Sequence, residues 1–484
     1  MNSFTGPGLA AVSRFAGMQW ARKRSCRGPL ILLTALLCGC AAPAAWRNAP
    51  LTADENVRYD GRAQLFHAGR AADLLVVASF SGGGSRAAAF ASAVVAELDA
   101  EPFCWDGRST SLAQEIDMVT GISGGSIAAT HLVLHGVNGH LDRFERDFLL
   151  KNFQRSLLGS ALSPAGLYRQ TSDHYGRGQI LADELDAHLF QGRTFGDLAA
   201  KPAHPYLIVG ATDLATGADF DFTSEQMKLM CSSIDAVPLA FAVAASSSVP
   251  LLFSPLTVQN HASACPVARM PLPAVRAEDM PRTRLARAEA EAVTQAKRAY
   301  LHLVDGGLSD NLGTRRIVDY VEQAGGIVPL LAQLRRGSAH PGPLTIVFIT
   351  VNSERLSPHP IDGQSTVPSV LEVLDAMVFG GMGRYSRETA LVFSDAVAQW
   401  QEQLNAASKG DGSDPPLLHA IDLGLNGLND PILRDEVLTI PTAFHIQPAQ
   451  VTALRRAAFQ TLQNAPGYRA FRDQATRGRR ADCR

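Results

Sequence analysis

The stretch TGISGGSIAA, residues 120–129, decides how this chain folds. Ser123 lies between Gly121 and Gly125 in the pattern G-x-S-x-G, after the β-type run IDMVT and before the helical run SIAATHLVLHG. A strand, a sharp turn and a helix form the setting of a nucleophile elbow. Side chains at the two glycines would collide across that turn. The pattern therefore predicts Ser123 as a nucleophile; the alternative is a serine that only forms the turn before a helix.

A second glycine-rich loop, SGGGSR at residues 81–86, follows the buried β-type run DLLVVASF and precedes an alanine-rich helical run. The uncovered backbone N–H groups of Gly82, Gly83 and Gly84 can bind a developing oxyanion. The same loop fits the dinucleotide fingerprint G-x-G-x-x-A, which would end at Ala87. A plain strand-to-helix turn is the third alternative, and the loop alone does not decide among them.

A third loop, LVDGGLSDN at residues 303–311, places Asp305 at the end of the β-type run AYLHLVD. Sheets of parallel strands place their sites at the carboxyl edge, so this carboxylate is a candidate site residue. The alternative is an Asx-turn or helix-capping aspartate, which is a common use of Asp-Gly.

Strand-like and helix-like segments alternate along the middle of the chain. Further strands are expected at PYLIVGATDL and LTIVFITVN, and a short one at LLHAIDLG, with helical runs between them. This alternation predicts an α/β fold with a mainly parallel sheet and helices on both faces. Residues beyond about 360 read as mostly helical.

The three loops, in this order, resemble the patatin-like phospholipase family. Supporting stretches lie between them in the family's order: RTFGDL at 193–198, ATDLATG at 211–217 and AVAASSSVPLLFSPLTV at 242–258. The resemblance covers roughly residues 73–315. It implies a three-layer α/β/α sandwich and a catalytic dyad of Ser123 and Asp305 without a histidine.

The resemblance also implies the roles of the first glycine loop. The amides of Gly82, Gly83 and Gly84 would form the oxyanion hole, and Arg86 would brace the loop. Ala87 departs from the glycine that the family usually has there. Residues 259–298 read as an insertion, either a lid over the site or a solvated surface excursion.

The N-terminus carries targeting signals. Residues 1–39 contain five basic residues and no acidic one. The basic residues precede the apolar run PLILLTALL, as in a secretory signal. The motif LCGC resembles the bacterial lipobox, which implies that Cys40 is lipidated and holds the protein on a membrane of the cell envelope. An uncleaved signal anchor is the alternative. The organisation expected is a signal peptide at 1–39, a tether at 40–70, a catalytic domain at 71–355 and a C-terminal helical extension packed on it at 356–484.

The net charge and the cysteine content limit the classes of partner that the chain is expected to bind. The formal net charge of −2 gives no basic excess for nucleic acid. Four cysteines remain after the signal, and their spacing matches no zinc pattern. Cys231–Cys265 is a plausible disulfide, but the pairing of these two with Cys104 and Cys483 cannot be read from spacing. No metal and no cofactor are expected.

The family resemblance implies a serine acyl hydrolase that acts on phospholipid or lysophospholipid esters, of phospholipase A type. Two other functions remain open. One is an envelope lipoprotein that keeps the fold without catalysis, and the other is a dinucleotide-binding enzyme built on the loop from Gly82 to Ala87.

Overall fold

A computed structural model describes residues 46–52, 57–61, 71, 73–201, 204–265, 281–295, 297–335, 344–355, 360–363, 365–412 and 414–477. The predicted signal peptide, Cys40 and most of the tether lie outside these residues. Within the described part of the chain, no helix is long and apolar enough to cross a membrane.

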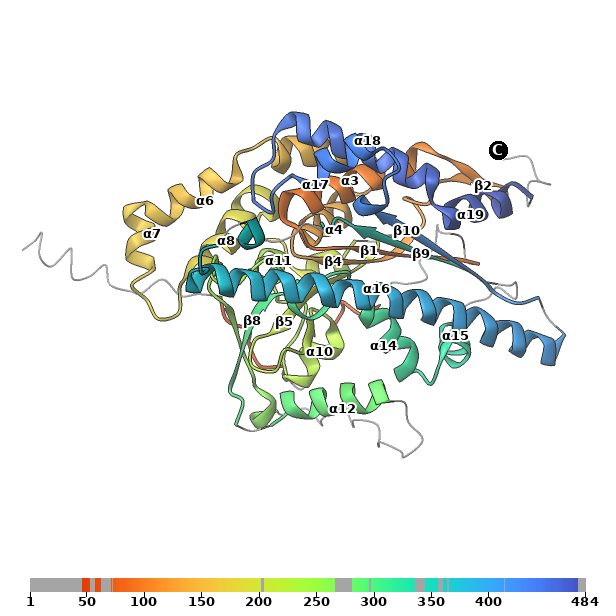
Figure 1. Cartoon of the computed structure of the whole chain (residues 1–484). Helices are drawn as coiled ribbons and strands as arrows, with labels where there is room; N and C mark the ends of the chain where they lie inside the picture. The colour runs from red at the N-terminus through yellow and green to blue at the C-terminus, as the bar shows by residue number, and fades with distance from the viewer. Residues whose placement is uncertain are drawn as a thin grey trace, which may run out of the picture. The chain divides into compact units, whose positions relative to one another are not determined.

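An eight-stranded sheet forms the centre of the fold, and its strands from one edge inward to β5 are parallel (Figure 1). Every residue of β1 and β5 is buried, which explains why these strands appear in the sequence as unbroken apolar runs. The parallel strands, in spatial order, are β10 (Leu417–Gly424), β9 (Thr345–Asn352), β1 (Leu74–Phe80), β4 (Ile116–Ile122) and β5 (Tyr206–Asp213).

Beyond β5 the strand direction changes. The strands on this side are β8 (Tyr300–Asp305) and β6 (Asp219–Asp221), both antiparallel to β5, and β7 (Leu256–Gln259), antiparallel to β8. Asp305 therefore ends a strand that runs antiparallel to its neighbours, within a sheet that is mainly parallel as predicted. An apolar run does not encode its direction, and the strand order is fixed only by the pairing partners. A separate antiparallel pair, β2 (Phe103–Trp105) with β3 (Arg108–Thr110), lies outside the sheet.

Alternate residues of β1 enter two different cores, which makes the fold three-layered. Val76 and Ala78 face one core, and Leu75 and Val77 face the other. The predicted three-layer α/β/α arrangement is confirmed. The first core contains α3 (Gly84–Ala100), α4 (Gly124–His135), α11 (Leu239–Ser246), α17 (Pro431–Leu438) and α18 (Pro448–Asn464); the second contains α14 (Arg315–Gln323), α15 (Ile327–Arg335) and the 42-residue α16 (Val370–Asp411).

Shorter elements complete the chain. They are α5 (His140–Phe144), η1 (Glu145–Leu149), α6 (Phe153–Leu162), α7 (Pro164–Arg169), α8 (Arg177–Leu185), η2 (Asp186–Phe190), α9 (Phe195–Ala199), α10 (Ser224–Leu229), η3 (Ala262–Ala264), α12 (Pro281–Val293), α13 (Gly307–Asp310), η4 (Pro360–Gly363), η5 (Leu425–Gly427) and α19 (Pro466–Arg477).

The C-terminal third is mostly helical, as predicted, but it also completes the sheet. All eight residues of β10 pair in parallel with β9, so this region supplies an edge strand rather than only packing on the sheet. The described part of the 259–298 insertion lies against α14, since Arg282 of α12 forms an ion pair with Asp319 at 3.1 Å.

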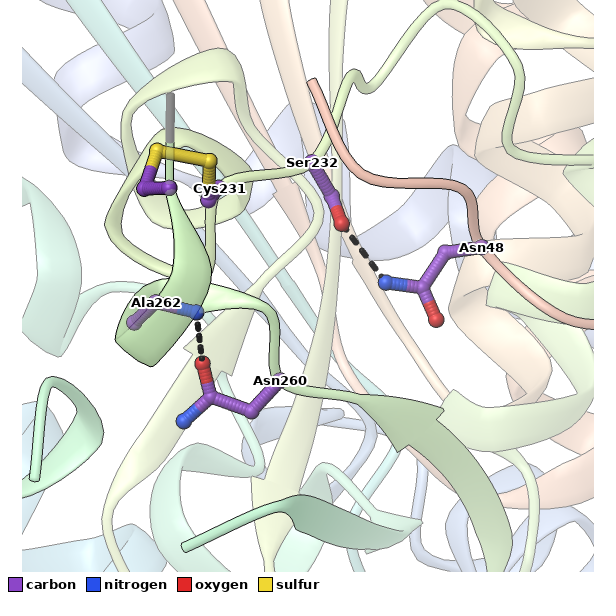
Figure 2. The surroundings of a disulfide bond; sticks show 6 residues. Asn48, Cys231, Ser232, Asn260 and Ala262 are labelled. Carbon is purple, nitrogen blue, oxygen red and sulfur yellow. Dashed lines mark hydrogen bonds between the residues drawn. A yellow bond between two sulfur atoms is a disulfide. The ribbon is translucent and has the colours of Figure 1, made fainter. Parts of the chain in front are cut away.

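A disulfide joins Cys231, two residues after α10, to Cys265, near the start of the insertion (Figure 2). The plausible pairing read from the sequence is thus confirmed. Next to it, the side chain of Asn48 donates a hydrogen bond to Ser232 Oγ at 2.7 Å, which holds the N-terminal segment against the same region. Cys104 is also disulfide-bonded.

Candidate active site

Ser123 lies at the sharp turn between β4 and α4. Its φ of 50° and ψ of −124° are strained for a residue with a side chain. A Cβ on Gly121 would lie 2.5 Å from the Cα of Ser126, and one on Gly125 would lie 2.4 Å from the carbonyl oxygen of Phe80. Only glycine fits at both positions, and this is the geometry that the G-x-S-x-G pattern predicts.

Ser246, at the end of α11, holds the strained turn in place. The Ser123 amide donates a hydrogen bond to Ser246 Oγ at 2.8 Å, and that hydroxyl donates to the carbonyl of Gly210 in β5 at 2.6 Å. The turn is therefore tied through one side chain to the neighbouring strand. Ser246 lies in the AVAASSSVP stretch that supported the family resemblance, but nothing in its spacing indicated this contact.

The sheet brings Ser123 and Asp305 together across β5. Ile122, which precedes Ser123, is in register with Gly210 of β5, and Asp305 is in register with Ala211. Ser123 and Asp305 therefore lie on either side of β5 at neighbouring positions along it. Ser123 Oγ donates a hydrogen bond to Asp305 Oδ2 at 2.8 Å. Although β8 runs antiparallel to β5, the serine and the carboxylate lie in direct contact.

Asp305 is almost completely buried, with 1% of its surface exposed. Burial raises its pKa from 3.8 to about 6, although hydrogen bonds from the Gly307 amide and Ser123 oppose the shift. Gly307 donates to Oδ1 at 2.8 Å, which leaves Oδ2 for the serine. Thr212 Oγ1 donates to the backbone carbonyl of Asp305 at 2.8 Å and also bonds Ser309, so the loop after β8 is fixed.

The loop of Gly82, Gly83 and Gly84 does not offer three equivalent amides. The Gly82 amide donates to the carbonyl of Asn311 at 3.0 Å. Among the described residues, the amides of Gly83 and Gly84 have no hydrogen-bond partner. Two of the three predicted donors are therefore available to a ligand, and the third connects the loop to the segment after Asp305.

Arg86 is buried and spans from the glycine loop to the C-terminal region. Its Nε donates to the carbonyl of Ser353 at 3.0 Å, and another guanidinium nitrogen donates to the carbonyl of Ile440. Burial lowers its pKa to about 10. The carbonyl of Ala443 accepts from the Ser85 amide at 2.8 Å, so a main-chain carbonyl occupies the start of α3, where a dinucleotide would place its pyrophosphate. This arrangement speaks against the dinucleotide alternative.

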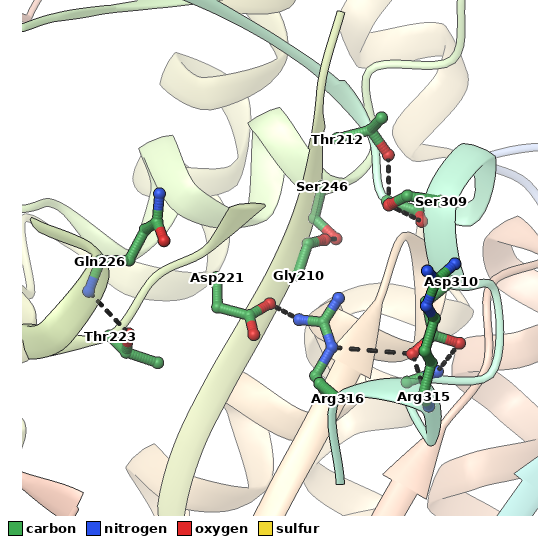
Figure 3. A network of polar contacts seen from close by, with 12 residues as sticks. Gly210, Thr212, Asp221, Thr223, Gln226, Ser246, Ser309, Asp310, Arg315 and Arg316 are labelled. Atoms are coloured by element: carbon green, nitrogen blue, oxygen red, sulfur yellow. Dashed lines mark hydrogen bonds and ion pairs between the residues drawn. The ribbon is translucent and has the colours of Figure 1, made fainter. Parts of the chain in front are cut away.

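A buried network of charges holds the segment that follows Asp305 (Figure 3). Arg316 of α14 forms ion pairs with Asp221 of β6 and with Asp310. Asp310 also accepts from the amides of Gly313 at 3.0 Å and Arg315 at 2.9 Å. Sequence reasoning missed this network because its members lie on separate elements, although Asp310 stands within the quoted LVDGGLSDN stretch.

Among the described residues, neither a histidine nor a metal cluster lies at the site. The side chain of Ser123 hydrogen-bonds Asp305, and the side chain of Asp305 also accepts from the Gly307 amide. His302 is exposed and bonds Thr257, on the face of β8 away from the site. No group of three or more His, Cys, Asp or Glu in this part of the chain could hold a metal ion.

The fold and site define a class: an α/β protein with a serine in a strained strand-to-helix turn, hydrogen-bonded to a buried carboxylate. Residues 78–317 match the family described as patatin-like phospholipase. The chain belongs to the patatin-like phospholipase family and is, in broad terms, a lipid acyl hydrolase.

Solved structures give weaker similarities. Human GIVD cytosolic phospholipase A2 is 12% identical with a TM-score of 0.42, over 88% of this chain and 68% of that one. VipD from Legionella pneumophila is also 12% identical, with a TM-score of 0.29, over 81% and 66%. Among curated proteins, none matches the chain.

Proposed function

We propose that this chain hydrolyses fatty-acyl esters of phospholipids or lysophospholipids through a dyad of Ser123 and Asp305. The observation that carries the proposal is the 2.8 Å hydrogen bond from the serine hydroxyl to the carboxylate. A serine hydroxyl is a weak nucleophile until an adjacent base takes its proton. A carboxyl group with a pKa of about 6 is a base at neutral pH and an acid strong enough to return the proton.

The proposed reaction has two halves. Ser123 Oγ attacks the ester carbonyl carbon while its proton moves to Asp305 Oδ2, and the carbonyl π electrons move onto oxygen. The amides of Gly83 and Gly84 stabilise that oxyanion. As the intermediate collapses, Asp305 returns the proton to the departing alkoxide. Water then attacks the acyl-enzyme by the same route, with Asp305 as base, and releases the fatty acid and the free serine.

Exposed apolar side chains favour a substrate that lies in a lipid surface. The first turns of α16 expose Val370, Leu371 and Met377, with 68% and 69% of the last two exposed. The same helix reaches the site, because the Cε of Met382 lies 2.4 Å from the position of a Cβ on Gly307. An apolar helix face that leads to the dyad is suited to contact with lipid.

The anchoring part of the proposal rests on the sequence. We propose that Cys40 is lipidated and holds the enzyme on a bacterial envelope membrane, beside its substrate. Stable attachment needs more than one acyl chain, as a bacterial lipoprotein carries. Mass spectrometry of the mature N-terminus tests this point, and a Cys40→Ser protein that stays bound to membranes would contradict it.

The deciding experiment compares wild type with Ser123→Ala and Asp305→Asn on nitrophenyl butyrate and on defined phospholipids. Both variants are expected to lose activity at least 1,000-fold, by the scale of loss that removal of a nucleophile or its base produces. Ser394→Ala and Asp395→Asn, at exposed positions of α16, are matched controls that keep full activity.

A fluorophosphonate probe identifies the nucleophile directly. Labelling is expected in wild type and absent in Ser123→Ala. If Ser123→Ala labels or turns over like wild type, the dyad is refuted. If wild type is labelled but hydrolyses no ester on a broad lipid panel, the proposed enzymatic function is refuted in favour of a binding function for the retained fold.

A further inference from the structure

Asn311 is the last residue of the stretch LVDGGLSDN, which contains Asp305. It lies next to both the glycine loop and the loop that follows Asp305. The chain there is held by the buried Asp310, whose carboxylate binds the amides of Gly313 and Arg315 (Figure 3). The backbone carbonyl of Asn311 accepts the Gly82 amide at 3.0 Å. The position of Asn311 is therefore fixed by its backbone, independently of its side chain.

The side chain of Asn311 fills a space that two glycines leave open. Its Oδ1 lies 2.4 Å from the position of a Cβ on Gly82 and 2.9 Å from that of a Cβ on Gly307. The Cβ of Ser123 lies 3.3 Å from the same point on Gly82. The carboxamide thus lies between the glycine loop and the aspartate loop, beside the nucleophile.

This carboxamide is buried but has no partner. Asn311 is 7% exposed, and among the described residues its side chain makes no hydrogen bond. The polar atoms of the carboxamide are not sealed from solvent, so part of the amide faces open space. A largely buried polar side chain without a protein partner is a candidate for a hydrogen bond to a ligand.

We propose that the side-chain NH2 of Asn311 donates a hydrogen bond to the oxyanion of the tetrahedral intermediate, as a third donor beside the amides of Gly83 and Gly84. Oδ1 is the end of the carboxamide nearest both glycines, and no hydrogen bond among the described residues engages Nδ2, which leaves Nδ2 for a ligand. No proton moves to or from Asn311: the hydroxyl proton of Ser123 goes to Asp305, and the amide only stabilises the charge. This inference rests on the proposed function.

Asn311→Ala and the isosteric Asn311→Asp test the donor. Loss of one oxyanion donor lowers kcat by about 100- to 1,000-fold with little change in KM, and the carboxylate of the second variant can only accept. Asn464→Ala, an exposed asparagine at the end of α18, is the matched control and stays at the wild-type rate. Thermal unfolding of each variant shows that it is folded.

The readout that separates a donor from a structural residue is a pair of substrates. In a thionoester, sulfur replaces the carbonyl oxygen and is a weak hydrogen-bond acceptor. Wild type is expected to be much slower on the thionoester than on the ester, and this ratio should shrink at least tenfold in both Asn311 variants. A structural lesion slows both substrates equally, and an unchanged ratio would overturn the proposal.

The outcomes also separate this inference from the function on which it rests. If Ser123→Ala keeps its turnover, the proposed dyad itself fails. If Ser123→Ala is inactive while both Asn311 variants keep the wild-type ester rate, the dyad stands and the assignment to Asn311 falls.

Discussion

Replacement of Asp305 by asparagine is expected to abolish turnover and to stabilise the fold at pH 8. Burial raises the pKa of Asp305 from 3.8 to about 6, so the folded protein carries a charge that it disfavours. A shift of about two units at about 1.36 kcal/mol per unit amounts to about 3 kcal/mol. This value is an upper bound for the gain, because the asparagine NH2 cannot accept the hydrogen bond from Ser123.

The sign of the pH dependence follows from proton binding. Between pH 3.8 and 6 the folded state holds the proton of Asp305 and the unfolded chain has released it, so the stability of wild type falls as pH rises. Below that window the carboxyl is protonated in both states and the cost disappears. The gap between Asp305→Asn and wild type should therefore be small near pH 4 and reach its full size by pH 8, while wild-type activity rises through pH 6.

Urea unfolding at the two pH values measures this gap by linear extrapolation. Asp395→Asn, at an exposed position of α16, serves as the matched control. A difference between Asp305→Asn and wild type that is the same at pH 4 and pH 8 would refute the reasoning, and with it the role of burial in tuning the base.

Three further predictions concern the serine turn, the disulfide and the exposed apolar start of α16. Gly125→Ala places a Cβ against main-chain atoms and should cost about 2–4 kcal/mol, seen as a lower Tm and lost fluorophosphonate labelling; a wild-type Tm would contradict the close approach. Removal of the Cys231–Cys265 disulfide, whose cysteines are 34 residues apart, in a Cys231→Ser, Cys265→Ser variant should cost about 3–4 kcal/mol, measured by urea unfolding against wild type without reductant. Leu371→Asp should lower activity on phospholipid vesicles at least tenfold but leave nitrophenyl butyrate hydrolysis unchanged; equal effects on both would exclude a lipid-contact role.

The three glycine loops could be predicted from the sequence because each is a local pattern. The close approaches at Gly121 and Gly125 depend on residues within the turn or on the adjacent strand, and a short motif encodes them. The contact of Ser123 with Asp305 followed from the order of the loops, through the family resemblance rather than from the spacing itself. A distance of 182 residues contains no geometric information until the sheet order is known.

The features that sequence reasoning missed depend on long-range pairing. The antiparallel direction of β8 and the place of β10 at the sheet edge are decided by neighbouring strands, since an apolar run pairs in either direction. The contact of Arg86 with Ile440 joins residues 354 apart. The family resemblance implied the bracing role of Arg86, but no pattern in the sequence indicated the C-terminal partner.

Two features of this site are energetically unfavourable, and the surrounding structure must offset both. Ser123 has a strained backbone, and Asp305 is a buried carboxyl with a disfavoured charge. Each is held by neighbours that play no part in the chemistry: Ser246 fixes the turn, and Thr212 fixes the carbonyl of Asp305. These supports lie on β5 and α11, between or beside the two catalytic loops. A substitution in either support should therefore lower activity by misplacing the dyad, because each support makes a buried hydrogen bond that holds one of the two catalytic loops.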